Sequence, residues 1–201
     1  MIIAIESAST DLSLALADPD GRVFALEGWS AGRRQGGELL PRLLALLEAN
    51  GRHVAQASSV AVGSGPGSFT GLRVGMSVAK GLCAGLGLPI VGIPSLVAWL
   101  DAEPERAAAL VRAGAREAYL LERGAADPLL VDRDGSVDHG HSLVAPVELA
   151  EAFGLSDTRP PHRAAAAVAA RAAARLADDP AGDDLRRLEP IYLRAPRGIG
   201  P

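Results

Sequence analysis

Hydrophobic and polar positions in the first hundred residues follow periods that predict alternating strands and helices. A short apolar run at residues 2–5 and a two-residue alternation at 12–18 predict two strands. The motif Asp-Pro-Asp-Gly at 18–21 is typical of a tight turn, so residues 22–28 are expected to return as a third strand of a meander. Buried-type apolar runs at 58–64 and 89–93 predict two further strands.

Three segments of the same region carry apolar residues at helical spacing. Residues 37–51 place leucines on a wide apolar face and end at Asn50-Gly51, a common helix stop. Pro41 is expected to sit in the first turn of this helix or to kink it. A long helix is predicted over 71–86 and a short one over 95–103. Three strands, helix, strand, helix, strand is the order of one ribonuclease H-like lobe.

The second half of the chain has a different composition. Residues 108–124, 127–137 and 141–146 predict strands joined by turns, and an Ala/Arg-rich helix is expected around 163–177. We therefore predict an α/β protein with an N-terminal lobe at 1–101 and a smaller, abbreviated second lobe at 102–201. No repeat with solenoid spacing is present.

Composition and charge narrow the class of protein. Apolar residues make up 48% of the 201 residues and aromatic residues 3%, which predicts a globular core of aliphatic side chains. The net charge of −4 gives no global attraction to nucleic acid, so RNA contact needs a local patch or a partner. Cys83 is the only cysteine, and the first residues become acidic too soon for a signal peptide. Since no long apolar run is present either, we expect a soluble, cytoplasmic protein.

The Gly-rich stretch before the long helix is a candidate ligand site. Its glycines can expose backbone N–H groups, and Ser68 or Thr70 can cap a helix whose dipole favours an anion. The candidate cofactor-binding residues are Gly65, Gly67, Ser68 and Thr70. A phosphate-loop lysine is missing, because Lys80, the only lysine, lies two turns inside the helix. A strand–turn–helix junction without a ligand is the alternative.

The long helix carries two apolar stripes, whereas packing on a sheet needs only one. One stripe consists of Leu72, Met76, Ala79, Cys83 and Leu86; the other consists of Gly71, Gly75, Val78, Leu82 and Gly85. Glycines four residues apart suit close contact with a second helix, which is either the chain's own helix at 37–51 or that of a partner. Both hold if the two helices form an exposed pair that a partner completes. The candidate partner-binding residues are Leu39, Leu43, Leu47, Gly71, Gly75, Val78 and Leu82.

Several stretches together resemble the TsaB family, also called YeaZ. They are IIAIESAST at 2–10, LLPRLLALL at 39–47, AVGSGPGSFTGLRVGMSVAKGLCAGLGLPIVGIPSL at 61–96 and LEPIYLR at 188–194. GPGSFTGLRVG is the most specific of these motifs. The family usually shows His-Ser-Glu before its first helix, where this chain has Gln35-Gly36-Gly37. If that histidine helps the family's interface, the pairing surface differs here in detail.

The resemblance implies two ribonuclease H-like lobes of the actin and sugar-kinase type. It implies a non-catalytic scaffold or activator that pairs with the catalytic paralogue TsaD and the ATPase TsaE, so that TsaD can threonylcarbamoylate adenosine next to the anticodon of tRNA. In the family, N-lobe helices meet TsaD in a helical bundle. ATP and a metal then belong to the partner complex, and this chain has no cofactor of its own. We expect tRNA contact only within the complex and no membrane contact. A third alternative is that the same apolar helix face forms a homodimer when the partner is missing.

The resemblance also implies that TsaD's metal centre is absent. TsaD places two histidines four residues apart after the equivalent strand, and Ser95 and Trp99 stand at those positions here. His139 and His141, near Asp132, Asp134 and Asp138, are better interpreted as a polar turn than as a metal cluster.

An enzyme is the alternative: an ATP-using kinase-like protein or a glycoprotease-type peptidase. Glu6 and Asp11 follow the first strand, but no lysine stands ready to anchor a phosphate. The serines of this region have no identifiable histidine partner; they are Ser7, Ser64, Ser68 and Ser95. Near the C-terminus a group of arginines could touch tRNA or form a solvated basic tail; these are Arg186, Arg187, Arg194 and Arg197.

Overall fold

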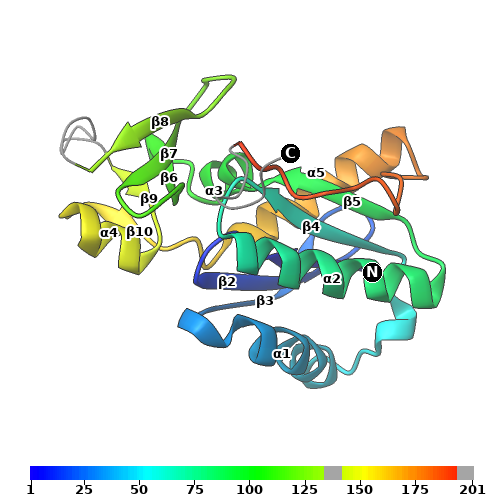
Figure 1. Ribbon diagram of the computed structural model, residues 1–201. Helices are drawn as coiled ribbons and strands as arrows, with labels where there is room; N and C mark the ends of the chain where they lie inside the picture. Colours follow the sequence, from blue (N-terminus) through cyan, green and yellow to red (C-terminus); the bar gives the residue numbers. More distant parts are fainter. Residues whose placement is uncertain (134–141, 194–201) are drawn as a thin grey trace, which may run out of the picture.

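The computed structural model describes residues 1–133 and 142–193 and contains two five-stranded sheets (Figure 1). In the first sheet the strand order is β3-β2-β1-β4-β5. β2 pairs antiparallel with β1 and β3, whereas β4 pairs parallel with β1 and β5. Its strands are β1 (Ile2–Glu6), β2 (Asp11–Ala17), β3 (Val23–Ser30), β4 (Ser59–Gly65) and β5 (Ile90–Pro94). The predicted meander and the two strands after it are confirmed.

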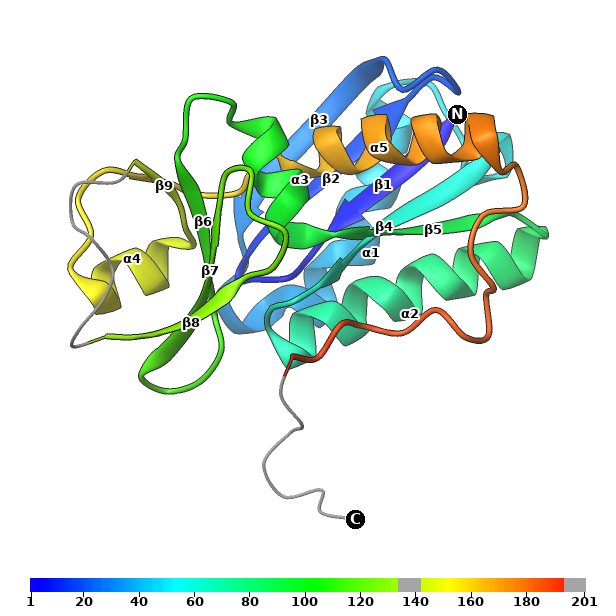
Figure 2. The same ribbon diagram turned by 90° about the horizontal axis from the view of Figure 1, so that it is seen from above.

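Helices cover both faces of the first sheet (Figures 1 and 2). α1 (Gln35–Ala49) and α2 (Phe69–Leu86) lie side by side on one face. α3 (Ser95–Ala102) and α5 (Ala164–Asp178) lie on the other. Short 3₁₀ turns, η1 (Gly32–Arg34) and η2 (Val54–Gln56), flank α1 in the chain. The three helices predicted in the first half, and the Ala/Arg-rich helix of the second, are all present.

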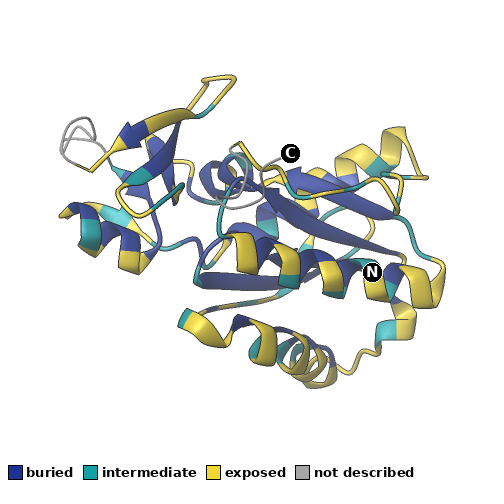
Figure 3. Cartoon of the chain, in the orientation of Figure 1, coloured by how far each residue is buried: buried dark blue, intermediate teal, exposed yellow. Residues whose placement is uncertain are grey.

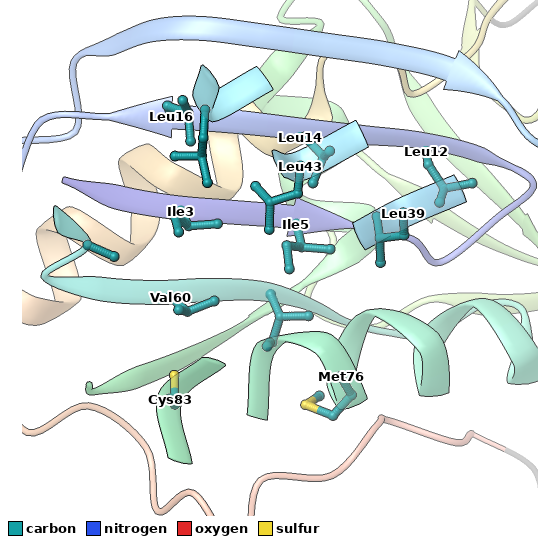
Figure 4. Close-up of a cluster of buried hydrophobic side chains, with 14 of the residues drawn as sticks. Ile3, Ile5, Leu12, Leu14, Leu16, Leu39, Leu43, Val60, Met76 and Cys83 are labelled. Atoms are coloured by element: carbon teal, nitrogen blue, oxygen red, sulfur yellow. The ribbon is translucent and has the colours of Figure 1, made fainter. Parts of the chain in front are cut away.

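The side chains of β1 show why this sheet is buried on both faces. Ile3 and Ile5 point into a cluster with α1 and α2, whereas Ile2 and Ala4 pack beneath α5. Successive side chains of a strand alternate between faces, so a strand covered on both sides is apolar at every position. Figure 4 shows the first of these clusters. The uninterrupted apolar run at the start of the chain therefore indicates a central strand, covered on both faces.

Pro41 lies in the second turn of α1, which continues past it to Ala49. Its ring removes one helical hydrogen bond, to the carbonyl of Gly37. Both residues are exposed, so water can satisfy that carbonyl. Figure 3 shows this exposed outer side of α1 in contrast to the buried strands above it.

The second sheet repeats the topology of the first. β6, β7 and β8 form an antiparallel meander, and β9 and β10 follow in parallel beside β6, giving the order β10-β9-β6-β7-β8. Its strands are β6 (Ala108–Arg112), β7 (Glu117–Glu122), β8 (Leu129–Asp132), β9 (Leu143–Val144) and β10 (Thr158–Arg159). The seven-residue helix α4 (Val147–Phe153) and β10 were not predicted, because both are too short to show a period.

After the second sheet the chain returns to the first. α5 packs on β1 and β2, and the segment after it runs along the edge strand β5 (Figure 2). The N–H of Asp183 donates to the carbonyl of Ile90 (2.8 Å), and the N–H of Gly92 donates to the Asp183 carboxylate (2.7 Å). The edge of the sheet is thereby covered. The predicted boundary after residue 101 stays a prediction, but part of the second half lies on the first sheet.

Candidate functional site

Leu39, Leu43 and Leu47 lie beneath α1, in the core between this helix and the first sheet. Their exposed fractions are 0%, 0% and 2%. Figure 4 shows Leu39 and Leu43 among Ile5, Leu12 and Leu14. The expectation that these three leucines face a partner is therefore wrong for the folded chain, because the helix uses this stripe to bind its own sheet.

Gly71 and Gly75 are buried as well. A Cβ at Gly71 would clash with the backbone oxygen of Ser7, and a Cβ at Gly75 would clash with the Ser7 hydroxyl. That hydroxyl donates a hydrogen bond to the carbonyl of Gly71 (2.9 Å). The two glycines let the loop after β1 approach the α2 backbone, so their spacing serves a contact inside the chain and not the predicted contact with another helix.

The surface that the two helices expose consists of other residues. Leu40 and Leu44 are 41% and 50% exposed. Gly36 faces α2, since a Cβ there would lie 3.8 Å from Val74. Leu40 and Leu44 follow Gly36 at four-residue intervals, so they continue along this side of α1 and turn gradually outward.

On α2 the matching positions are Val74, Val78 and Leu82, which are half-buried against the core cluster that α1 and α2 share with the first sheet. Gly81 and Gly85 are exposed, with no atom within 4 Å of an added Cβ. We call this area the α1–α2 surface; it comprises Leu40, Leu44, Val74, Val78, Gly81, Leu82 and Gly85. Of the seven predicted partner-binding residues, Val78 and Leu82 belong to it.

Charged side chains gather on the opposite flank of α1. Arg42 pairs with Glu27, and Arg34 pairs with Glu38 (2.9 Å). Glu38 also accepts a hydrogen bond from the indole of Trp29 (3.0 Å). These groups join α1 to β3 on the side of the helix away from the α1–α2 surface.

The Gly-rich turn lines a groove between the two lobes. Ser68 caps α2, its hydroxyl accepting the N–H of Gly71 (3.2 Å), as predicted. The groove has a volume of about 490 Å³. Gly67, Ser68 and Thr70 line it, whereas Gly65 is buried behind the turn. Its remaining walls come from Pro66, Phe69, Arg112–Ala115, Glu117, Tyr119 and Ile191–Leu193.

The end of the described chain closes one side of this groove. The N–H of Ile191 donates to the carbonyl of Ser64 (2.7 Å). The rings of Tyr192 and Phe69 lie 5.4 Å apart, and the Arg73 guanidinium lies 3.9 Å from the Phe69 ring centre. Arg186 and Arg187 are exposed upstream of this contact, while Arg194 and Arg197 lie outside the described residues.

His162 lies near a serine and an aspartate, but the geometry differs from a catalytic triad. Its Nε2 is 3.3 Å from the Ser30 hydroxyl and 3.2 Å from the Asp11 carboxylate. A triad needs the acid on Nδ1 and the serine on Nε2. Here Ser30 donates to Asp11 itself, and the other Asp11 oxygen accepts the N–H of Val147 (2.8 Å). Asp11 is therefore well placed to join the two lobes.

Metal-ligand side chains do not gather in groups of three within residues 1–133 and 142–193. His139, His141, Asp134 and Asp138 lie outside the described residues. Ser95, the first residue of α3, and Trp99, one turn later, are fully buried. Cys83 is buried too, and burial raises the pKa of its thiol to about 11.

Glu6, at the end of β1, is a fully buried acid. Burial raises its pKa to about 7, against smaller opposing effects of the Ala8 N–H, which donates to Oε1, and of the nearby Ser95 and Trp99 side chains. A Cβ at Gly63 on β4 would overlap its Oε2 atom, so the glycine makes room for the carboxyl group.

The raised pKa of Glu6 predicts that the chain loses stability as pH rises from about 4.5 to about 7. In this window the folded state holds the proton more tightly than the unfolded state, so proton release favours unfolding. The full effect is on the order of 3 kcal/mol. Denaturant unfolding at acid and alkaline pH should show this loss, and Glu6→Gln should reduce it. The same pH dependence in both proteins would contradict the assignment to Glu6.

Comparison with known proteins identifies the family. The model described as "TsaD: tRNA N6-adenosine threonylcarbamoyltransferase" matches residues 30–158, more than half of the chain. The tRNA threonylcarbamoyladenosine biosynthesis protein TsaB of Escherichia coli (strain K12) is 34% identical over 126 residues, which cover 60% of this chain and 54% of that protein. The chain belongs to the TsaB (YeaZ) family.

Other relatives extend the match along the chain. An uncharacterized protein of Mycobacterium bovis, Mb3455c, is 32% identical over 97% of this chain and 92% of its own length. TsaB of Haemophilus influenzae is 32% identical over 126 residues, which cover 60% of this chain and 52% of that protein. This member therefore spans about half the length of the two TsaB proteins that it matches.

Solved structures show the TsaB fold. YeaZ from Pseudomonas aeruginosa superposes with a TM-score of 0.69 at 21% identity, covering 96% of this chain and 99% of that one. The activator of 2-hydroxyisocaproyl-CoA dehydratase from Clostridium difficile, solved with ADPNP, gives 0.52 at 12% identity and covers 89% and 96%. The predicted fold, two ribonuclease H-like lobes of the actin and sugar-kinase type, is confirmed.

The TsaB motif GPGSFTGLRVG, at 65–75, covers the groove-lining turn, the helix cap and the two glycines against Ser7. Leu40 and Leu44 were missed, although each directly follows a buried leucine, Leu39 or Leu43, in LLPRLLALL. Arg112–Ala115 and Ile191–Leu193 carry no sequence signal that would bring them to one groove. Among the described helices, none is both long and apolar enough to cross a membrane.

Proposed function

We propose that this chain acts in the biosynthesis of threonylcarbamoyladenosine in tRNA, as a non-catalytic partner of a TsaD homologue and a TsaE homologue. Membership of the TsaB family supports the pathway, since its relatives in two bacteria are named for it. The matching family model is itself named for the threonylcarbamoyltransferase, which supports a common origin of the two subunits.

The α1–α2 surface carries the proposal that the chain works through a partner. Two adjacent helices present exposed leucines on α1 and uncovered glycines on α2. Leucine side chains supply apolar area, and glycines let a second helix approach closely. A pair of helices from TsaD, laid across this surface, would complete a four-helix bundle and bury both features.

The division of chemistry follows from the same proposal. Ser95 and Trp99 occupy the positions of the paired histidines expected in TsaD, and both are packed in the core and out of reach of a substrate. We therefore assign the metal and the transfer step to TsaD, and ATP hydrolysis to TsaE. This chain would hold TsaD in its active arrangement.

Reconstitution of the modification tests the proposed function. With TsaD and TsaE homologues, threonylcarbamoyl-adenylate, ATP and tRNA, product should form in the presence of this chain and fall to background when it is omitted. Nucleoside analysis by mass spectrometry measures the product, and heat-denatured chain serves as the control. Equal product with and without the native chain would refute the proposal.

The interlobe groove supports a second candidate, an ATP-using kinase-like enzyme. Its volume of about 490 Å³ suits a small ligand, and Arg112 lies in its wall. Calorimetry of the isolated chain with ATP and Mg²⁺ separates the two candidates. Tight binding by this chain alone would favour the kinase-like enzyme, whereas the scaffold proposal expects no such binding.

A further inference from the structure

Glu6, Ser95 and Trp99 form a buried polar cluster that the proposed function does not use. Glu6 ends β1, and the other two residues lie one helical turn apart on α3. All three are 0% exposed. A carboxyl group in such a place needs a physical explanation, because burial without compensation strongly disfavours its charge.

The cluster is only partly hydrogen-bonded. Oε1 of Glu6 accepts the N–H of Ala8 (2.7 Å). Oε2 has no hydrogen-bond partner, and neither has the indole Nε1 of Trp99. The Ser95 and Trp99 side chains nevertheless lie close enough to Glu6 to favour its charged form. An unused acceptor and an unused donor are therefore neighbours in the core.

The groups around this carboxyl carry no charge. Ser13 on β2 stands opposite Glu6 in the sheet, and Gly63 on β4 adjoins it. α5 opens with Ala164–Ala167 and covers the same face. The titratable groups further along this face, Asp11 and His162, bind each other and Ser30.

We propose that Glu6, Ser95 and Trp99 form a proton-linked switch at the junction of the two lobes. With a neutral Glu6, Oε2 needs no donor, and the Trp99 indole stays unpaired as observed. After proton loss, the carboxylate attracts both the indole N–H and the Ser95 hydroxyl. The two protonation states then favour two positions of the Trp99 ring.

The neighbours of the cluster provide a path from the switch to the surface. The Ser95 hydroxyl accepts the N–H of Gly65 (3.0 Å), at the start of the Gly-rich turn. Trp99 packs in the cluster that joins Leu72 of α2 to Val111 and Tyr119 of the second sheet. Tyr119 also lines the interlobe groove. A shift of the Trp99 ring would therefore change the packing between the lobes. This inference does not rest on the proposed function.

Nuclear magnetic resonance of Trp99 tests the switch in the isolated chain. Trp29 and Trp99 are the only tryptophans, so Trp29→Phe leaves one indole N–H signal. Between about pH 5 and pH 9 this signal should move with a midpoint near 7. Glu6→Gln should abolish the movement. Ser95→Ala should raise the midpoint, since the charged form loses a donor.

Two results would overturn the switch: a Trp99 signal that does not move across this range, or a movement that persists in Glu6→Gln. If Glu6→Gln fails to fold, the carboxyl carbon of Glu6 can be titrated in the Trp29→Phe protein. A Glu6 midpoint near its ordinary 4.5 would then refute the proposal, and a midpoint near 7 that coincides with the Trp99 shift would support it.

Discussion

Leu44→Glu is expected to abolish binding to a TsaD homologue while the isolated chain stays folded. Leu44 is 50% exposed on α1, so a glutamate there remains hydrated in the free chain and should change its stability by less than about 1 kcal/mol. In the proposed bundle the same carboxylate would be buried without a partner. We expect affinity to fall at least about 100-fold, as for other central interface residues. Calorimetric titration with the TsaD homologue measures this loss.

A matched control lies one residue away. Ala45 is exposed on the same helix but points away from α2, so Ala45→Glu adds the same charge outside the α1–α2 surface and should leave binding unchanged. Light scattering of the free chain shows in addition whether Leu44→Glu removes any self-association through this surface. Binding of Leu44→Glu with unchanged affinity would contradict the proposed interface.

Gly71→Ala is expected to unfold the chain or to destabilise it severely. The added methyl group would clash with the backbone oxygen of Ser7, which cannot rotate away as a side chain can. α2 would have to separate from the loop after β1 and lose the Ser7 hydrogen bond to Gly71. We expect a loss of roughly 4 kcal/mol or more, above the usual range for point substitutions. Denaturant unfolding followed by circular dichroism measures it.

The same helix supplies the control for this prediction. Gly81 is exposed and has no atom within 4 Å of an added Cβ. Gly81→Ala should therefore keep or raise stability, by up to about 1 kcal/mol, because alanine favours the helix more than glycine does. Equal stability of Gly71→Ala and the wild-type chain would show that the glycine is not required by packing.

These two pairs of variants distinguish residues that pack inside the chain from residues that are exposed to a partner, which the sequence alone does not distinguish. Gly71, Gly75 and Gly85 read as one stripe of small residues, yet the first two contact the chain's own loop and the third lies open. Helical spacing predicts which residues share a side of α2. It does not predict whether the neighbour on that side is a loop, a helix of the same chain or a partner.

The groove shows a similar limit. Its Gly-rich wall could be predicted, because glycines and a capping serine at a strand–helix junction have a local signature. Arg112, Tyr119 and Tyr192 join that wall through the pairing of β6 with β7 and the path of the chain along β5. No local pattern encodes contacts between segments so far apart.

By itself, the sequence determined the local structure: the strands of the first sheet, the long helices, the turn at 18–21 and the Gly-rich cap. The periods of strand and helix and the backbone preferences of glycine and proline act over a few residues, so they are readable there. Only the tertiary structure decided which leucine of each pair in α1 faces the core, where Glu6 is buried, and that the second sheet repeats the topology of the first. These outcomes depend on which elements, distant in the sequence, pack together. Burial results from such tertiary contacts and not from a residue's neighbours in the chain.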